Sequence, residues 1–124
     1  MTTLTVVRPI VVTDPVIISS TVPEDPLAAW AAATTYPLGA RAYLASTHKI
    51  YQSLQAGNLN HTPTGLATDL WWVEVSATNR WKMFDTSNST STVAANNMTY
   101  VLRPGSVVNC LALLGVVASS VRIR

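Results

Sequence analysis

The large side chains of this protein are concentrated in the middle of the sequence. Eight of its nine aromatic residues lie between Trp30 and Phe84, whereas both flanking segments are aliphatic and rich in Thr and Ser. Because aromatic side chains dominate the energetics of small cores, we expect the compact core in the middle of the chain. The flanks must then gain stability from short strands or from contacts with other polypeptides.

The pattern of apolar residues indicates β-structure throughout. No window shows the sustained three-and-four spacing of an amphipathic helix, and several stretches alternate between apolar and polar residues. We therefore predict an all-β protein in three parts. Residues 1–27 form an extended N-terminal arm and linker, residues 28–78 a small three-stranded, aromatic-rich module, and residues 79–124 a β-rich assembly segment. This last segment is expected to be part of a sandwich or to be completed by partner subunits.

The predicted arm contains strand-prone clusters that prolines interrupt. The clusters are Val6-Val7, Ile10-Val11-Val12 and Val16-Ile17-Ile18, and the prolines are Pro9, Pro15, Pro23 and Pro26. Because proline cannot donate a hydrogen bond to a sheet, these strands should be short, lie at an edge or add to the sheet of another chain. Residues 21–26 read as a linker in which Glu24 and Asp25 are solvated.

The middle of the sequence predicts a hairpin and a third strand. Residues 41–44 and 49–55 are expected to pair, the second of these showing clear alternation, and residues 71–75 form the third strand. Residues 57–69 contain two glycines and a proline and are expected to form a loop.

The last third of the sequence also reads as strands. Residues 98–103 should form a strand that ends at Pro104-Gly105, followed by strands over 107–114 and 116–123. The continuous apolar runs suit a sheet covered on both faces, with Cys110 as a small buried residue. Because the sequence stops directly after a strand pattern, we expect either a longer protein or a component that partners complete.

The low charge of the chain limits the classes of partner. Charged residues make up 11%, against roughly 25% in an average soluble domain, and such a surface suits an assembly. Residues 86–124 carry three arginines and no acid, which is too sparse for a nucleic-acid surface. Residues 104–121 are uncharged, but Pro104, Gly105, Asn109 and Gly115 argue against a membrane span. The N-terminus does not resemble a signal peptide.

The sequence offers little support for catalysis. No pair of acids has a spacing that suggests a glycosidase site, and His48 and His61 lie in predicted loops without a cluster of metal-ligand spacing. We expect no enzyme, no metal and no cofactor. A hydrolase that uses Asp69 or Glu74 is the most distant alternative.

The aromatic residues have two alternative interpretations. In the first, a ring stacks on the apolar face of a sugar, and the tentative carbohydrate-binding residues are Tyr36, Tyr51, Trp71 and Trp72. In the second, these side chains are the core of a module too small to have another. Neighbours on a strand face opposite ways, so Trp71 and Trp72 cannot both be buried on one face. The structural core of the module is expected to include Trp30, Gly39, Leu54 and Pro63.

The segment from Trp30 to Trp72 resembles the chitin- and cellulose-binding modules of bacterial chitinases and cellulases. The resemblance covers about a third of the chain and departs from the family at Ala40 and Ala42, where the family usually has aspartate and valine. Its matching residues are Trp30, Tyr36, Gly39, Tyr51-Gln52, Asn58, Pro63 and Trp71 or Trp72. It implies a small β-module that binds carbohydrate.

A second resemblance is to the copies of this module in bacteriophage tail and virion proteins. Residues 51–54 with Asn58, Pro63 and Trp71, followed by residues 79–85, are similar to that group. The resemblance implies a non-enzymatic virion component of tail, neck or fibre type, made in the bacterial cytoplasm. Its partners would be other virion subunits, in a homo-oligomer or a larger symmetric assembly. The alternative is a polysaccharide-binding module that recognises a glycan on the host cell surface.

Overall fold

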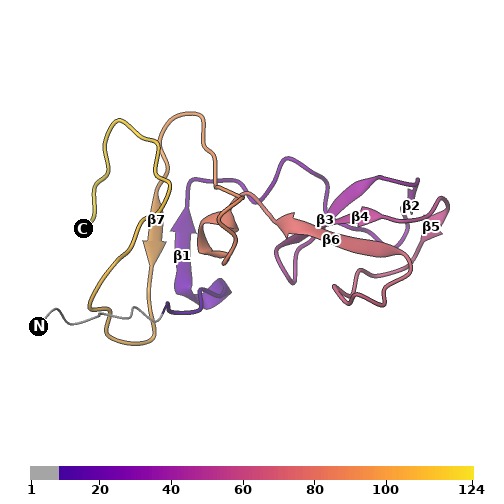
Figure 1. The fold of residues 1–124 in the computed structure, drawn as a ribbon, viewed down its shortest axis with the longest axis horizontal. Coiled ribbons are helices and arrows are strands. Elements are labelled where there is room, and N and C mark those ends of the chain that lie inside the picture. Colours follow the sequence, from indigo (N-terminus) through magenta and orange to yellow (C-terminus); the bar gives the residue numbers. More distant parts are fainter. Residues whose placement is uncertain (1–8) are drawn as a thin grey trace, which may run out of the picture.

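The structure is a computed structural model that describes residues 9–124, and it is all-β (Figure 1). Three small antiparallel sheets have the strand orders β1-β7, β2-β5 and β3-β4-β6. The β1-β7 pair lies at one end of the molecule and the other two sheets at the opposite end. The strands are β1 (Ile17–Ser20), β2 (Thr35–Tyr36), β3 (Arg41–Leu44), β4 (Lys49–Ser53), β5 (Asn58–Leu59), β6 (Trp72–Ala77) and β7 (Tyr100–Leu102), with 3-10 turns η1 (Asp14–Val16) and η2 (Lys82–Phe84).

The predicted hairpin of the aromatic module (residues 28–78) is confirmed. β3 and β4 are antiparallel, and Ala42 faces Tyr51 across the pair. The connection between them is longer than the shortest hairpin turn and includes His48, whose φ is 55°. Alternation along β4 turns Tyr51 and Ser53 to one face of the sheet, where both are buried.

The third strand also forms, with shifted ends. β6 covers Trp72–Ala77 rather than the predicted 71–75, and among residues 9–124 it pairs only with β4. Ile50 faces Ser76 while Tyr51 faces Glu74, so Val75 is an extra residue, a β-bulge. A bulge bends the strand that carries it and interrupts its ladder.

The core of the module is small and aromatic. Tyr36, Ala42, Tyr51 and Trp72 form it, and Trp30 packs against it while half-buried. Pro63 is buried, as predicted. The prediction for Leu54 is wrong, because Leu54 is 42% exposed: it follows Ser53 directly, and alternation turns it away from the core.

Gly39 has a conformational role rather than a packing role. Its φ is 82° and it is exposed, with nothing within 4 Å of the position that a Cβ would take. Its N–H donates to the carbonyl of Ser53 at 2.8 Å, which joins the turn before β3 to the end of β4. Glycine adopts this positive φ without the steric penalty of other residues, so the turn depends on it.

Part of the predicted extended arm forms a short strand within the fold. β1 pairs with β7, from Ile17 opposite Leu102 to Ser20 opposite Tyr100. The prediction that residues 21–26 form a linker is wrong, because Val22 is fully buried and its carbonyl accepts a 2.7 Å hydrogen bond from Arg80 Nε. The cluster Ile10-Val11-Val12 forms no strand with the residues described, and Val6-Val7 lies outside them.

A row of rings connects β7 to the aromatic module. Tyr100 meets Phe84 edge-on at 5.3 Å, Phe84 meets Trp81 at 6.2 Å, and Trp81 stacks on His48 at 4.1 Å. Burial raises the pKa of Tyr100, so its hydroxyl stays protonated and donates to the Arg80 carbonyl at 2.7 Å. The two ends of the molecule are therefore joined by packing as well as by the chain.

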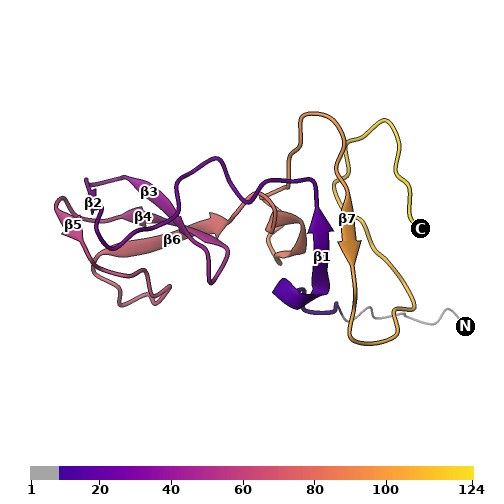
Figure 2. The same ribbon diagram turned by 180° about the vertical axis from the view of Figure 1, so that it is seen from behind.

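Residues 104–124, here called the apolar segment, form no strand within the described part of the chain. The strands predicted at 107–114 and 116–123 are therefore absent, and Cys110 is exposed rather than buried. Leu114 is 91% and Val117 99% exposed. Figure 2 shows this segment as a coil beyond β7, on the side away from the module. The composition favours strands, but a strand needs a neighbour for its backbone groups, and residues 9–103 provide none.

Candidate functional site

Three of the four predicted sugar-binding residues are core residues. Tyr36 is 8%, Tyr51 2% and Trp72 2% exposed. The rings of Tyr36 and Trp72 meet edge-on at 5.0 Å, and Trp72 Nε1 donates to the His61 carbonyl at 2.6 Å. Their predicted place on an exposed platform is wrong, because these side chains pack together with Ala42 in the centre of the module.

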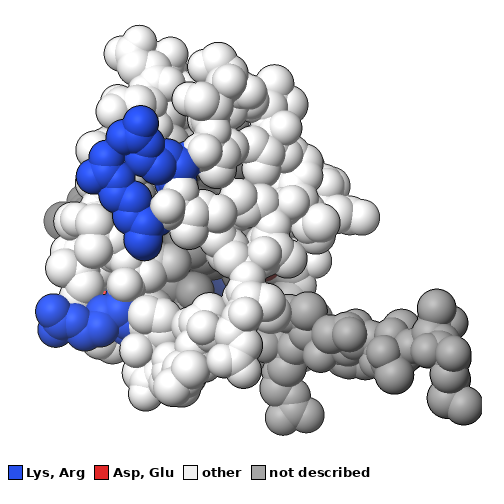
Figure 3. All heavy atoms as spheres, turned by 90° about the vertical axis from the view of Figure 1, so that its left-hand side faces the viewer, with Lys and Arg blue, Asp and Glu red and all other residues white. Residues whose placement is uncertain are grey.

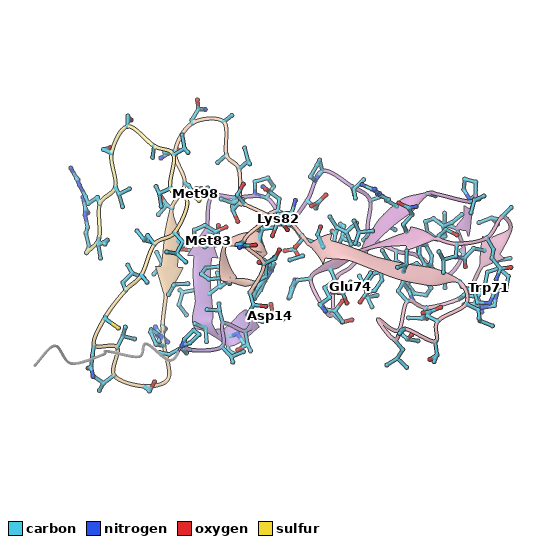
Figure 4. The ribbon with its side chains drawn as sticks, in the orientation of Figure 1. Asp14, Trp71, Glu74, Lys82, Met83 and Met98 are labelled. Atoms are coloured by element: carbon cyan, nitrogen blue, oxygen red, sulfur yellow. The ribbon has the colours of Figure 1, made fainter. Side chains whose placement is uncertain are left out.

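Trp71 is the less buried member of the pair and packs against the margin of the same core. It is half-buried and stacks on His61, with ring centroids 3.8 Å apart and planes 9° from parallel. Figure 4 places it at the end of the module farthest from β7. Because neighbouring side chains on a strand point in opposite directions, Trp72 is fully buried and Trp71 only partly. The prediction that His61 is simply an exposed loop residue does not hold, because its ring covers one face of the indole.

Asp69 organises the turn that presents Trp71. Its carboxylate accepts hydrogen bonds from the N–H groups of Thr64, Trp71 and Trp72 at 2.9–3.1 Å, and from the Thr64 hydroxyl at 2.8 Å. Partial burial acts to raise the pKa of Asp69, but these four hydrogen bonds outweigh it and hold the pKa below the usual 3.8. The carboxylate is therefore a structural anion that caps this turn.

We predict that Asp69→Asn lowers stability in a pH-dependent way. Because the folded pKa lies below the unfolded value of 3.8, the stabilisation by the carboxylate is complete above that pH and is lost as the pH falls through the folded pKa. The difference in free energy of unfolding between the two proteins should therefore shrink on acidification, which urea unfolding at a series of pH values measures. A difference that does not change with pH would contradict this role.

An open pocket of about 290 Å³ lies beside the first half of β6. Gly65 approaches the core closely there: a Cβ at this position would be 3.2 Å from the Tyr51 hydroxyl. Glu74 lies on the rim and pairs with Lys49 at 2.7 Å. The lining is mainly apolar and consists of Leu54, Gly65, Leu66, Ala67, Asp69, Trp72, Val73 and Glu74.

A polar cluster, here called the junction, connects the two ends of the molecule. Glu24 Oε1 accepts from His48 Nδ1 and from the Thr78 hydroxyl, each at 2.8 Å, and Arg80 Nη1 lies 3.4 Å from Glu24 Oε2. Asp25 accepts from the Asn79 N–H at 3.0 Å. The expectation that Glu24 and Asp25 are merely solvated is therefore wrong.

The sequence carried no signal for the junction. Glu24 is 24 positions from His48 and 54 from Thr78, so no local motif could indicate the contacts. His48 also has Asp14 Oδ1 at 2.8 Å from Nε2, within ion-pair distance although without hydrogen-bond geometry. Both ring nitrogens of His48 therefore lie against carboxylates.

The described residues contain no group of three or more His, Cys, Asp or Glu side chains that could hold a metal ion. Residues 9–124 also contain no helix that is long and apolar enough to cross a bilayer. Comparison of the chain with protein-family models, with curated proteins and with solved structures finds no match. The function therefore has to be inferred from the residues of this chain.

Proposed function

We propose that this protein is a non-enzymatic structural component of a bacteriophage virion, of tail, neck or fibre type. In this role it joins other subunits through the apolar segment. The observation that carries the proposal is the exposure of that segment, in which Val107, Leu114 and Val117 are each at least 86% exposed. The assignment to a phage particle comes from the resemblance of residues 51–72 and 79–85 to virion proteins.

The physical support is the free energy that assembly would release. Burying one fully exposed Val or Leu side chain stabilises a complex by about 1.5–3 kcal/mol, and the apolar segment exposes many of them. The backbone of the segment also makes no hydrogen bond to residues 9–103. An apolar segment whose backbone groups are free of other strands is suited to adding as a strand to a partner's sheet.

The β1-β7 sheet provides further support. It has two strands, one of four residues and one of three, and an isolated pair of that size is marginally stable in water. Ile18 and Val101 are 48% and 46% exposed on it. Contacts with neighbouring subunits would cover these side chains and extend the sheet.

We predict that Leu111→Asp combined with Leu114→Asp prevents incorporation into virions. Both side chains are exposed, so the subunit itself should keep its fold, while two charges would oppose burial at the contact. Mass spectrometry of purified particles, produced where the variant is the only copy, measures incorporation. Leu38→Asp with Val93→Asp, also at exposed positions, is the matched control. Incorporation of the segment variant at the wild-type copy number would refute the structural role assigned to the segment.

A second candidate function is contact with a glycan on the host surface. The half-buried Trp71 favours it, because its indole lies at the free end of the module and is held rigidly by His61 and by the Asp69 turn. A flat ring of this kind can stack on the apolar face of a sugar.

If Trp71 contacts glycans, the protein should be retained on insoluble chitin or peptidoglycan and Trp71→Ala should lower retention about tenfold or more, corresponding to a loss of about 1.4 kcal/mol. Sedimentation of the polysaccharide with bound protein measures the retained fraction. Leu59→Ala, at an exposed apolar position of the same module, is the control. If the wild-type protein is retained on no glycan, the glycan-binding function is rejected and the module has a structural role only.

A further inference from the structure

The outer edge of β6 is an open sheet edge on the aromatic module. Within residues 9–124, β6 has β4 as its only strand neighbour. Val73 and Val75 are 44% and 42% exposed along it. An unpaired edge presents free N–H and C=O groups, which is the feature that an added strand uses.

The other edge of the same sheet is covered. Along β3, the Tyr43 N–H donates to the Ala28 carbonyl at 3.2 Å, and the Tyr43 carbonyl accepts from the Trp30 N–H at 2.7 Å. A parallel bridge between Ala29 and Tyr43 accompanies these bonds. An added strand therefore finds free backbone groups on the β6 side.

The first half of β6 is the more suitable part of this edge. The bulge at Val75 interrupts regular pairing towards the end of the strand. The pocket of about 290 Å³ instead lies beside Trp72, Val73 and Glu74, where Leu66 is 64% exposed. An extended segment laid along this half could place apolar side chains in the pocket.

The charges of the chain match this edge to the apolar segment. The apolar segment carries Arg122 and Arg124 and no acid, and Arg103 directly precedes it, whereas residues 9–102 carry all six acids of the chain and only four basic residues. Figure 3 shows basic side chains on a mostly uncharged face at the β7 end of the molecule. Asp69 and Glu74 lie at the pocket, against one paired lysine, Lys49. Pairing of two β7 ends would bring like charges together, but pairing of a β7 end with a β6 edge would not.

We propose that the apolar segment of one copy docks on the first half of the β6 edge of a second copy. This docking rests on the proposed function only in that the apolar segment binds another subunit. It specifies that this subunit is a second copy of the chain and that the contact lies on the β6 edge. The two surfaces lie at opposite ends of the molecule (Figures 1 and 2), so donor and acceptor belong to different copies. Such a contact is head-to-tail, and repeated it closes a ring or extends a filament.

Two complementary variants test the proposal. Leu66→Arg with Val73→Arg places positive charge on exposed positions of the acceptor edge, and Leu111→Asp with Leu114→Asp disables the donor segment. We expect the wild type to form species larger than a dimer as its concentration rises, and each variant alone to sediment as a monomer. Mixed together, the two variants should form a dimer of one chain of each kind and nothing larger. The edge variant still has an intact donor segment and the segment variant still has an intact acceptor edge, so a single contact can form. Near-ultraviolet circular dichroism checks that each variant keeps its packed aromatic core.

The control Leu38→Arg with Val93→Arg adds the same charges at exposed positions outside the pocket lining and should associate like the wild type. The proposal is overturned if the wild type stays monomeric at its highest soluble concentration, if the edge variant still self-associates, or if the mixture stays monomeric. These outcomes are separate from the failure of the proposed function. A self-associating edge variant, together with exclusion of the segment variant from virions, would reject the β6 site and keep the virion role.

Discussion

Replacing Trp72 by alanine should destabilise the protein by about 3–5 kcal/mol, the range for removing a large aromatic side chain from a core. Trp72 is 2% exposed, meets Tyr36 edge-on and donates a hydrogen bond to the His61 carbonyl. With so few other large side chains in the module, the surroundings cannot collapse to fill the cavity. Urea unfolding followed by near-ultraviolet circular dichroism measures the change.

Trp71→Ala is the matched control for this result. The same side chain is removed one position earlier, but Trp71 is only half-buried, at the margin of the core, where it stacks on His61. We expect a loss of about 1 kcal/mol, the magnitude of an aromatic pair. Equal effects of the two substitutions would contradict the assignment of Trp72 to the core and Trp71 to the surface.

The second large effect is expected at the junction, where Glu24→Ala should destabilise the protein by about 2–3 kcal/mol. The Glu24 side chain is 18% exposed, and its removal leaves His48, Thr78 and Arg80 without their shared acceptor. Chemical unfolding measures the global loss. Hydrogen exchange of the Arg80 amide, which donates to the Glu24 carbonyl at 3.1 Å, should also accelerate as the junction loosens.

Glu74→Ala serves as the comparison for Glu24. It also removes one glutamate from an ion pair, but the Lys49 and Glu74 side chains are 43% and 35% exposed. Exposed pairs of this kind contribute under about 1 kcal/mol. If Glu24→Ala has no larger effect than Glu74→Ala, the junction does not hold the two ends of the molecule together.

The hairpin and the turns of the module could be predicted because their causes are local. Alternation from Lys49 to Gln55 and the turn residues up to Gly39 act over a few positions. β3 forms at the predicted residues, and β4 begins as predicted at Lys49 but ends at Ser53. The site could be predicted only in part. The pattern showed that Trp71 and Trp72 face opposite ways, but it could not show which of them faces the core.

At the flanks the sequence pattern was right for some segments and wrong for others. Ile17–Ser20 and Tyr100–Leu102 are strands where strands were expected, whereas residues 107–114 and 116–123 are not. Strand propensity in residues 107–123 and in the first 27 residues describes which segments could pair, whereas pairing depends on what lies beside them. Ile17–Ser20 finds Tyr100–Leu102, about eighty positions away, and becomes a strand. Residues 107–123, with a comparable apolar content, find no strand partner among the described residues and stay irregular and exposed.

Local information in the amino-acid sequence was thus enough to establish the all-β class, the central aromatic core and the hairpin, since these depend on side-chain alternation and turn chemistry over short distances. The burial of Tyr36, Tyr51 and Trp72, the contacts of Glu24 with His48 and Thr78, and the open edge of β6 emerged from the folded chain alone. Each depends on contacts between residues that are distant in sequence and come together only in the folded chain. A local sequence pattern does not predict such contacts.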